Sequence, residues 1–129
     1  MLKGYFFEIK QISETQMESG QGDQPEHFQV KISLNPGHPI YQGHFPGNPV
    51  VPGVCQIRMI TEIISEIFQK EVRLLEADNI KFLSMINPHE HPELTVDCRL
   101  QNTEEGNIRI TASISDREKI FFKSKSIFT

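Results

Sequence analysis

The chain has 129 residues and a net charge of −4 at pH 7, and 37% of its residues are hydrophobic. This length suits a single domain with one core, so we expect residues 1–129 to form one domain. No basic block suggests a nucleic-acid partner, and no apolar run approaches the roughly 20 residues that span a bilayer. The first residues lack a signal-peptide pattern and the cysteines are too few for a disulfide framework, which together predict a cytoplasmic protein.

The hydrophobic pattern predicts strands at both ends of the chain and one long helix between them. Residues 5–12 and 27–34 alternate as strands do, and residues 54–69 place isoleucines at helical spacing opposite a polar stripe. The period then changes, and residues 74–85, 94–100, 108–114 and 119–127 predict further strands joined as antiparallel hairpins. The order indicates an α+β protein in which a sheet packs against a central helix.

A loop rich in glycine and proline leads into the predicted helix. It reads Gly-His-Phe-Pro-Gly-Asn-Pro-Val-Val-Pro-Gly-Val over residues 43–54. Proline fixes φ and glycine opens otherwise forbidden angles, so the loop holds its one ionisable side chain, His44, in a set place. From residue types alone, His44 is either a functional group on a rigid loop or a chance residue in a turn.

These segments closely resemble the active-site region of the β-hydroxyacyl-acyl-carrier-protein dehydratases, over roughly residues 27–114. The matching residues are Ser33-Leu34-Asn35, Pro39-Ile40-Tyr41-Gln42-Gly43-His44-Phe45-Pro46-Gly47-Asn48-Pro49-Val50-Val51-Pro52-Gly53-Val54 and, after the helix, Asn79-Ile80-Lys81-Phe82-Leu83 with Pro88. The resemblance implies a hotdog fold, in which an antiparallel sheet wraps one central helix. It also implies a homodimer with two active sites at the interface, a substrate carried by acyl carrier protein, and no cofactor or metal.

The resemblance also implies roles for individual residues. His44 would act as the base on the α-carbon of a hydroxyacyl thioester, because imidazole titrates near neutrality. The thioester carbonyl would be held by the backbone N–H groups of Gly53 and Val54, since a helix N-terminus presents unpaired donors and partial positive charge. Phe45 and the aliphatic helix face either form a channel for the acyl chain or belong to the ordinary core.

One position departs from the family. The carboxylic acid that protonates the departing hydroxyl lies fourteen residues after the histidine in these enzymes, and Arg58 occupies that position here. Arginine does not donate a proton at neutral pH. Glu62 lies one helical turn further on the same face and either replaces the acid or forms an ordinary i,i+4 pair with Arg58.

Three interpretations of this departure remain open. Glu62 takes over as the acid, Arg58 holds the hydroxyl while His44 shuttles the proton, or the protein binds acyl thioesters without dehydrating them or hydrolyses them as a hotdog thioesterase. Arg58 also has a simpler interpretation as a surface residue whose stem packs beside the helix.

Three other residues each allow a functional and a structural interpretation. Cys55 near the helix start is either a reactive thiol or, more often for this residue type, a small core residue. His89 and His91 have the spacing of metal ligands but no further ligand nearby in sequence, which favours a solvated turn.

Overall fold

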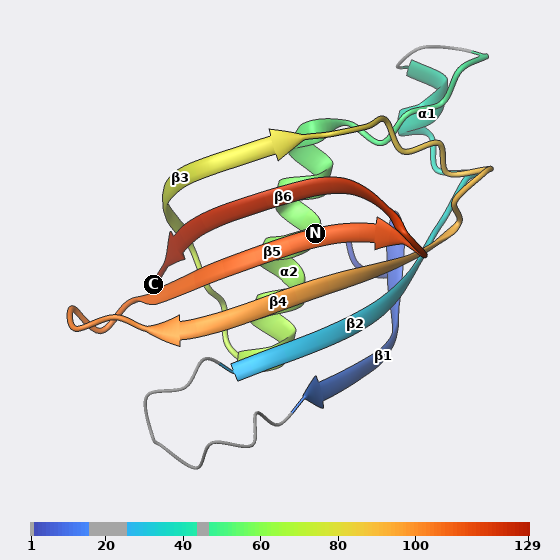
Figure 1. The fold of residues 1–129 in the computed structure, drawn as a ribbon. Coiled ribbons are helices and arrows are strands. Elements are labelled where there is room, and N and C mark those ends of the chain that lie inside the picture. Colours follow the sequence, from blue (N-terminus) through green and yellow to red (C-terminus); the bar gives the residue numbers. More distant parts are fainter. Residues whose placement is uncertain (1, 16–25, 44–46) are drawn as a thin grey trace.

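An antiparallel sheet wraps around one long helix in this computed structural model, which describes residues 2–15, 26–43 and 47–129 (Figure 1). The strands form one six-stranded sheet in the order β1-β2-β4-β5-β6-β3. The elements are β1 Phe7–Thr15, β2 Glu26–Leu34, α1 Ile40–Gly43, α2 Gly53–Phe68, β3 Leu74–Phe82, β4 Glu93–Asn102, β5 Ile108–Asp116 and β6 Lys119–Phe128. This is the predicted α+β arrangement.

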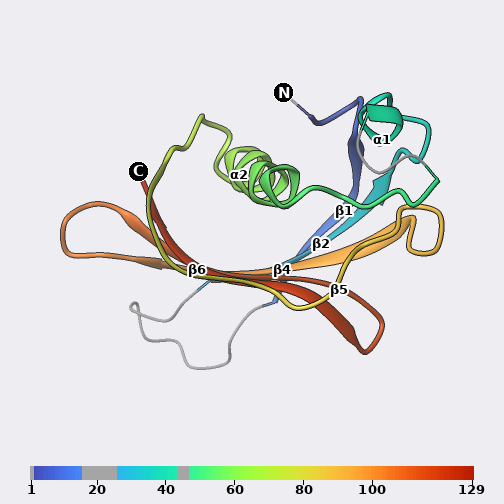
Figure 2. The ribbon, with the colours of Figure 1, turned by 90° about the horizontal axis from the view of Figure 1, so that it is seen from above.

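The core lies between α2 and the concave face of the sheet (Figure 2). On β4, for example, Val96 and Cys98 are buried while Asp97 between them is more exposed, because side chains alternate across a strand. Register extends this apolar face to the neighbouring strands, since Val96 pairs with Val30 on β2 and with Ile114 on β5.

Helix α2 buries one apolar stripe against this face. Met59, Ile63 and Ile64 are fully buried, and they recur at helical spacing. Isoleucine loses side-chain freedom in a helix, so tertiary packing stabilises α2 more than intrinsic propensity does. The helix ends at Phe68, and Gln69 caps it with a left-handed conformation at φ 54°. Among the described residues, no helix is both long and apolar enough to cross a membrane.

The structure differs from the sequence prediction at several boundaries. Strand β1 begins at Phe7 instead of Tyr5, because Tyr5 and Phe6 lie in a turn whose N–H groups donate to the Leu2 carbonyl at 3.1 and 2.8 Å. The one-turn helix α1 was not predicted. Strand β3 ends at Phe82, three residues before the predicted end at Met85.

Strand β3 forms one edge of the sheet, and it carries large apolar side chains that remain half exposed. Leu75 is 53% exposed and Phe82 is 52% exposed, and beyond the strand Met85 is 74% exposed. An edge strand presents unpaired backbone groups, and an apolar one is suited to pairing with another chain. The end of β3 lies beside the start of α2, where the candidate site is found.

Candidate active site

The N-terminus of α2 presents free backbone donors. Pro52 precedes the helix with φ −60° and ψ 147°, and its carbonyl accepts hydrogen bonds from Cys55 N–H and Gln56 N–H at 3.0 and 3.1 Å. No such bond joins the Gly53 or Val54 N–H to another residue within the described ranges. Val54 is also 75% exposed, so this first turn is open to a ligand. The two predicted carbonyl-binding residues therefore have the required donors.

The ring of Phe82 packs directly over this first turn. A Cβ atom at Gly53 would lie 2.8 Å from Cζ of Phe82, which is closer than side chains tolerate. The same ring contacts Phe122 with a centroid separation of 5.4 Å. Glycine at position 53 thus allows the end of β3 to approach the start of α2, and Phe82 forms an apolar wall beside the free donors.

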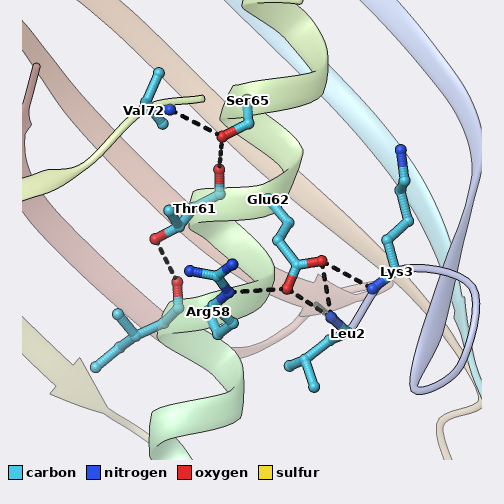
Figure 3. Close-up of polar contacts among 8 residues, drawn as sticks. Leu2, Lys3, Arg58, Thr61, Glu62, Ser65 and Val72 are labelled. Atoms are coloured by element: carbon cyan, nitrogen blue, oxygen red, sulfur yellow. Dashed lines mark hydrogen bonds and ion pairs between the residues drawn. The ribbon is translucent and has the colours of Figure 1, made fainter. Parts of the chain in front are cut away.

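Arg58 and Glu62 form the expected i,i+4 pair on α2 (Figure 3). Nε of Arg58 donates to Oε2 of Glu62 at 3.1 Å. The Arg58 side chain is 53% exposed, whereas Glu62 is 7% exposed. No hydrogen bond connects the Nη groups of Arg58 to any other residue in the described part of the chain. Arg58 therefore keeps donors available beside the helix N-terminus.

Glu62 is surrounded by N–H donors. The Leu2 N–H lies 2.9 and 2.8 Å from the two carboxylate oxygens, and the Lys3 N–H donates to Oε1 at 2.8 Å. With the bond from Arg58, every one of these contacts uses Glu62 as an acceptor. Figure 3 shows the carboxylate directed toward the N-terminal segment, with Arg58 reaching it from the preceding turn. This arrangement suits an ionised carboxylate that holds other groups in place.

His44 and Phe45 lie outside the described residues. The segments on either side of them are described, ending at Gly43 of α1 and resuming at Gly47. A shallow pocket of about 560 Å³ borders these two ends. It is lined by residues that include His38, Tyr41, Gly47, Pro49 and His89.

Two buried polar residues near the site were not anticipated from the sequence. Tyr41 stacks on Phe6 with ring centroids 5.5 Å apart, and burial raises the pKa of its hydroxyl. Gln56 donates from Nε2 to the Val51 carbonyl at 3.2 Å, which ties α2 to the segment that precedes it. The Tyr41 hydroxyl and Gln56 Oε1 are buried without a hydrogen-bond partner in the described structure. Tyr41 belongs to the segment that resembles the family, but neither its position nor that of Gln56 predicted a buried polar atom from the sequence.

The remaining candidates have structural contacts of their own. Cys55 is buried, and that burial raises the pKa of its thiol, so the core interpretation is confirmed over that of a reactive thiol. Nδ1 of His91 lies 2.6 Å from Oδ2 of Asp116. Among the pocket residues, Nδ1 of His38 accepts the Ile40 N–H at 3.1 Å, which helps to form the turn before α1.

Comparison with known proteins identifies relatives for most of the chain. The model of the ApeI-like family, described as ApeI dehydratase, matches residues 18–123. The chain is 34% identical over 103 residues to the 3-hydroxyacyl-acyl-carrier-protein dehydratase FabZ of Levilactobacillus brevis, covering 65% of this chain and 70% of that enzyme. It is 32% identical over 113 residues to FabZ of Lactobacillus helveticus, covering 72% and 76% respectively.

Solved structures share the fold at lower identity. The dehydratase heterocomplex ApeI:P from Xenorhabdus doucetiae superposes with a TM-score of 0.57 at 17% identity, covering 92% of this chain and 98% of that chain. A variant of a thioesterase enzyme from Staphylococcus aureus superposes with a TM-score of 0.55 at 10% identity, covering 92% and 91%. The fold is therefore the hotdog fold, and the family match places the chain in the ApeI-like dehydratases, among the β-hydroxyacyl-acyl-carrier-protein dehydratases of that fold.

Proposed function

We propose that this protein is a cytoplasmic dehydratase that removes water from β-hydroxyacyl thioesters carried by acyl carrier protein, in a fatty-acid or polyene-type pathway. The observation that carries the proposal is the first turn of α2, where the N–H groups of Gly53 and Val54 have no backbone partner within the described ranges. They follow the loop that resembles the His44 loop of the family. Such donors stabilise the negative charge that develops on a thioester carbonyl when the α-proton is removed.

In this mechanism His44 performs both proton transfers. Its imidazole removes the α-proton while the N–H groups of Gly53 and Val54 stabilise the enolate. The resulting imidazolium then gives that proton to the β-hydroxyl, and the C–O bond breaks to release water and the enoyl thioester. One proton is taken and one is returned, so no second acid is consumed. The acyl chain would lie along Phe45 and the aliphatic face of α2.

Arg58 is the group that we assign to the β-oxygen. Its side chain is 53% exposed on α2, so it can face a site that a second protomer completes. A guanidinium donates hydrogen bonds without losing a proton, and it stabilises the oxygen as it leaves. Glu62 is less suited to act as the acid, because its oxygens already accept N–H groups from Leu2, Lys3 and Arg58.

The proposed active form is a homodimer whose sites lie across the interface, with His44 of one protomer near Arg58 of the other. The apolar edge strand β3 supports this assembly, because Leu75 and Phe82 are half exposed in the single chain. The Xenorhabdus doucetiae neighbour is a heterocomplex. A different partner chain that supplies the missing carboxylate is therefore the alternative assembly for the same reaction.

Two other functions use the same fold. Without a proton donor the site would bind acyl thioesters and leave them intact, and a hotdog thioesterase would hydrolyse them. A function in binding alone stays an alternative, because the resemblance puts Arg58 where the family has its proton-donating carboxylate.

The test is incubation of the pure protein with β-hydroxyacyl carrier-protein thioesters of several chain lengths, with the products separated by mass. We expect a product 18 mass units lighter, formed by the native protein and not by His44→Ala, with carrier binding retained in both. A free acid in place of the enoyl product would identify a thioesterase. Binding without any product would identify a binding protein.

A further inference from the structure

The N-terminal segment is fastened to α2 by two carboxylates one turn apart. The segment, residues 2–7, forms a compact turn in which Gly4 N–H donates to the Phe7 carbonyl at 2.7 Å. Its backbone N–H groups at Leu2 and Lys3 bind Glu62, and Nζ of Lys3 lies 2.6 Å from Oε2 of Glu66. We call residues 2–7, held in this way, the N-terminal clasp.

Glu62 differs from Glu66 in burial and in its contacts. The side chain of Glu66 is 38% exposed and pairs with the flexible end of Lys3, whereas Glu62 is 7% exposed. A buried carboxylate is costly unless hydrogen bonds satisfy its oxygens. Here Oε1 of Glu62 accepts N–H groups from the clasp alone. Oε2 accepts both the Leu2 N–H and Nε of Arg58.

The contact at Nε fixes the orientation of the Arg58 guanidinium. The guanidinium is planar and rigid, so holding one N–H restricts the plane in which the two Nη groups lie. Val54, Arg58 and Glu62 follow one another at four-residue intervals, so Arg58 lies on one helix face between the free helix donors and the clasp. Its Nη groups make no hydrogen bond to any other residue in the described ranges.

We propose that Glu62 is a positioning residue that links the N-terminal clasp to Arg58 and aims the free Nη groups at the substrate oxygen. This inference rests on the proposed dehydratase function. The same carboxylate thus serves two groups, the backbone of the clasp and the side chain that replaces the family acid. A loss of the Glu62 contact to Nε leaves Arg58 in place but lets its guanidinium rotate.

Glu62→Gln removes the acceptor for Arg58 while it keeps one acceptor for the clasp. An amide oxygen in place of Oε1 still accepts the Leu2 and Lys3 N–H groups. An amide nitrogen in place of Oε2 opposes Nε of Arg58 and the second contact of the Leu2 N–H, so donors face each other there. Glu66→Gln is the matched control, because it weakens the clasp one turn away without touching Arg58. Arg58→Lys keeps the positive charge but removes the Nε donor and the planar fork.

The experiment is a double-mutant cycle of Glu62→Gln and Arg58→Ala, read as kcat and KM for dehydration alongside thermal unfolding. We expect each single variant to lower kcat about 10- to 100-fold, as misplacement of a catalytic group does. The double variant should be no slower than Arg58→Ala, since Glu62 acts through Arg58. Arg58→Lys should be as slow as Arg58→Ala, and Glu66→Gln should retain the native kcat.

Two results would overturn the inference. One is a kcat loss in the double variant that equals the product of the two single losses, and the other is a native kcat in Glu62→Gln. A second readout does not depend on activity or on the folding of any variant. The Nε–H proton of Arg58 in the native protein should exchange slowly with solvent in an NMR measurement, and fast exchange would contradict the positioning role. If the native protein does not dehydrate any thioester, the proposed function fails. The Nε–H measurement then still decides whether Glu62 holds the Arg58 guanidinium in one orientation.

Discussion

At the scale of single residues, Arg58 and Glu62 form an ion pair on α2, in which Oε2 of Glu62 accepts Nε of Arg58. The resemblance implies that Arg58 stands where the family has a carboxylate, and this part of the sequence interpretation stays a prediction. The sequence was sufficient to identify this pair from i,i+4 spacing. It was not sufficient to identify the backbone donors of Leu2 and Lys3, because a contact across some 60 residues leaves no local pattern.

The Lys3–Glu66 pair predicts a pH dependence of stability. The hydrogen bond and the charge of Lys3 lower the pKa of Glu66 from its usual 4.5. A carboxyl whose pKa falls on folding stabilises the protein above its unfolded value and loses this contribution as pH falls through the folded value. At pH 7 and low salt, Lys3→Ala should therefore reduce the free energy of unfolding by about 0.2–1 kcal/mol, as exposed pairs do.

This difference should vanish below the folded pKa of Glu66. Urea unfolding of the native protein and Lys3→Ala at pH 7 and at a series of lower pH values measures it. A difference that does not shrink as the pH falls would mean that the stem of Lys3 stabilises the clasp by packing, and not by its charge.

At the scale of elements, the hydrophobic period of the sequence predicts the helices and strands well where an element buries only one face. Helix α2 and strands β2, β4, β5 and β6 lie within a few residues of their predicted positions, because each buries one regular face. Prediction failed where a hydrogen bond outside the regular strand pairing sets the boundary. Phe6 is an aromatic residue that reads as strand, but its N–H bonds to Leu2, and Leu83 N–H binds the Phe121 carbonyl at 2.8 Å after β3 has ended.

The buried stripe of α2 predicts which helix residues determine stability. Ile63 is fully buried between the helix and the sheet, so Ile63→Ala should reduce the free energy of unfolding by about 2–5 kcal/mol through lost burial and a residual cavity. Ile67 is only partly buried on the same helix, and Ile67→Ala should cost less. Chemical denaturation of both variants provides the comparison, and equal losses would show that α2 does not pack as described.

At the scale of the whole molecule, the fold positions the site by bringing the ends of distant segments together. The loop before α2, the first turn of α2 and the end of β3 meet where Phe82 covers Gly53. The resemblance predicted the hotdog sheet and the dehydratase family, and the comparisons agree with both. The role of the helix donors stays a prediction. The unpaired edge of β3 then leaves an apolar surface beside the same site, which is where the proposed second protomer would bind.

The central claim is that a dehydratase site joins His44 of one protomer to Arg58 of the other. Mixing the variants His44→Ala, expected to be inactive, and Arg58→Ala, expected to be strongly impaired, by joint unfolding and refolding tests it most directly. Each mixed dimer would contain one site with both native residues. Random pairing makes half of the dimers mixed, so we predict about one quarter of the native dehydration rate. A mixture no more active than the separate variants would contradict a site shared between the protomers.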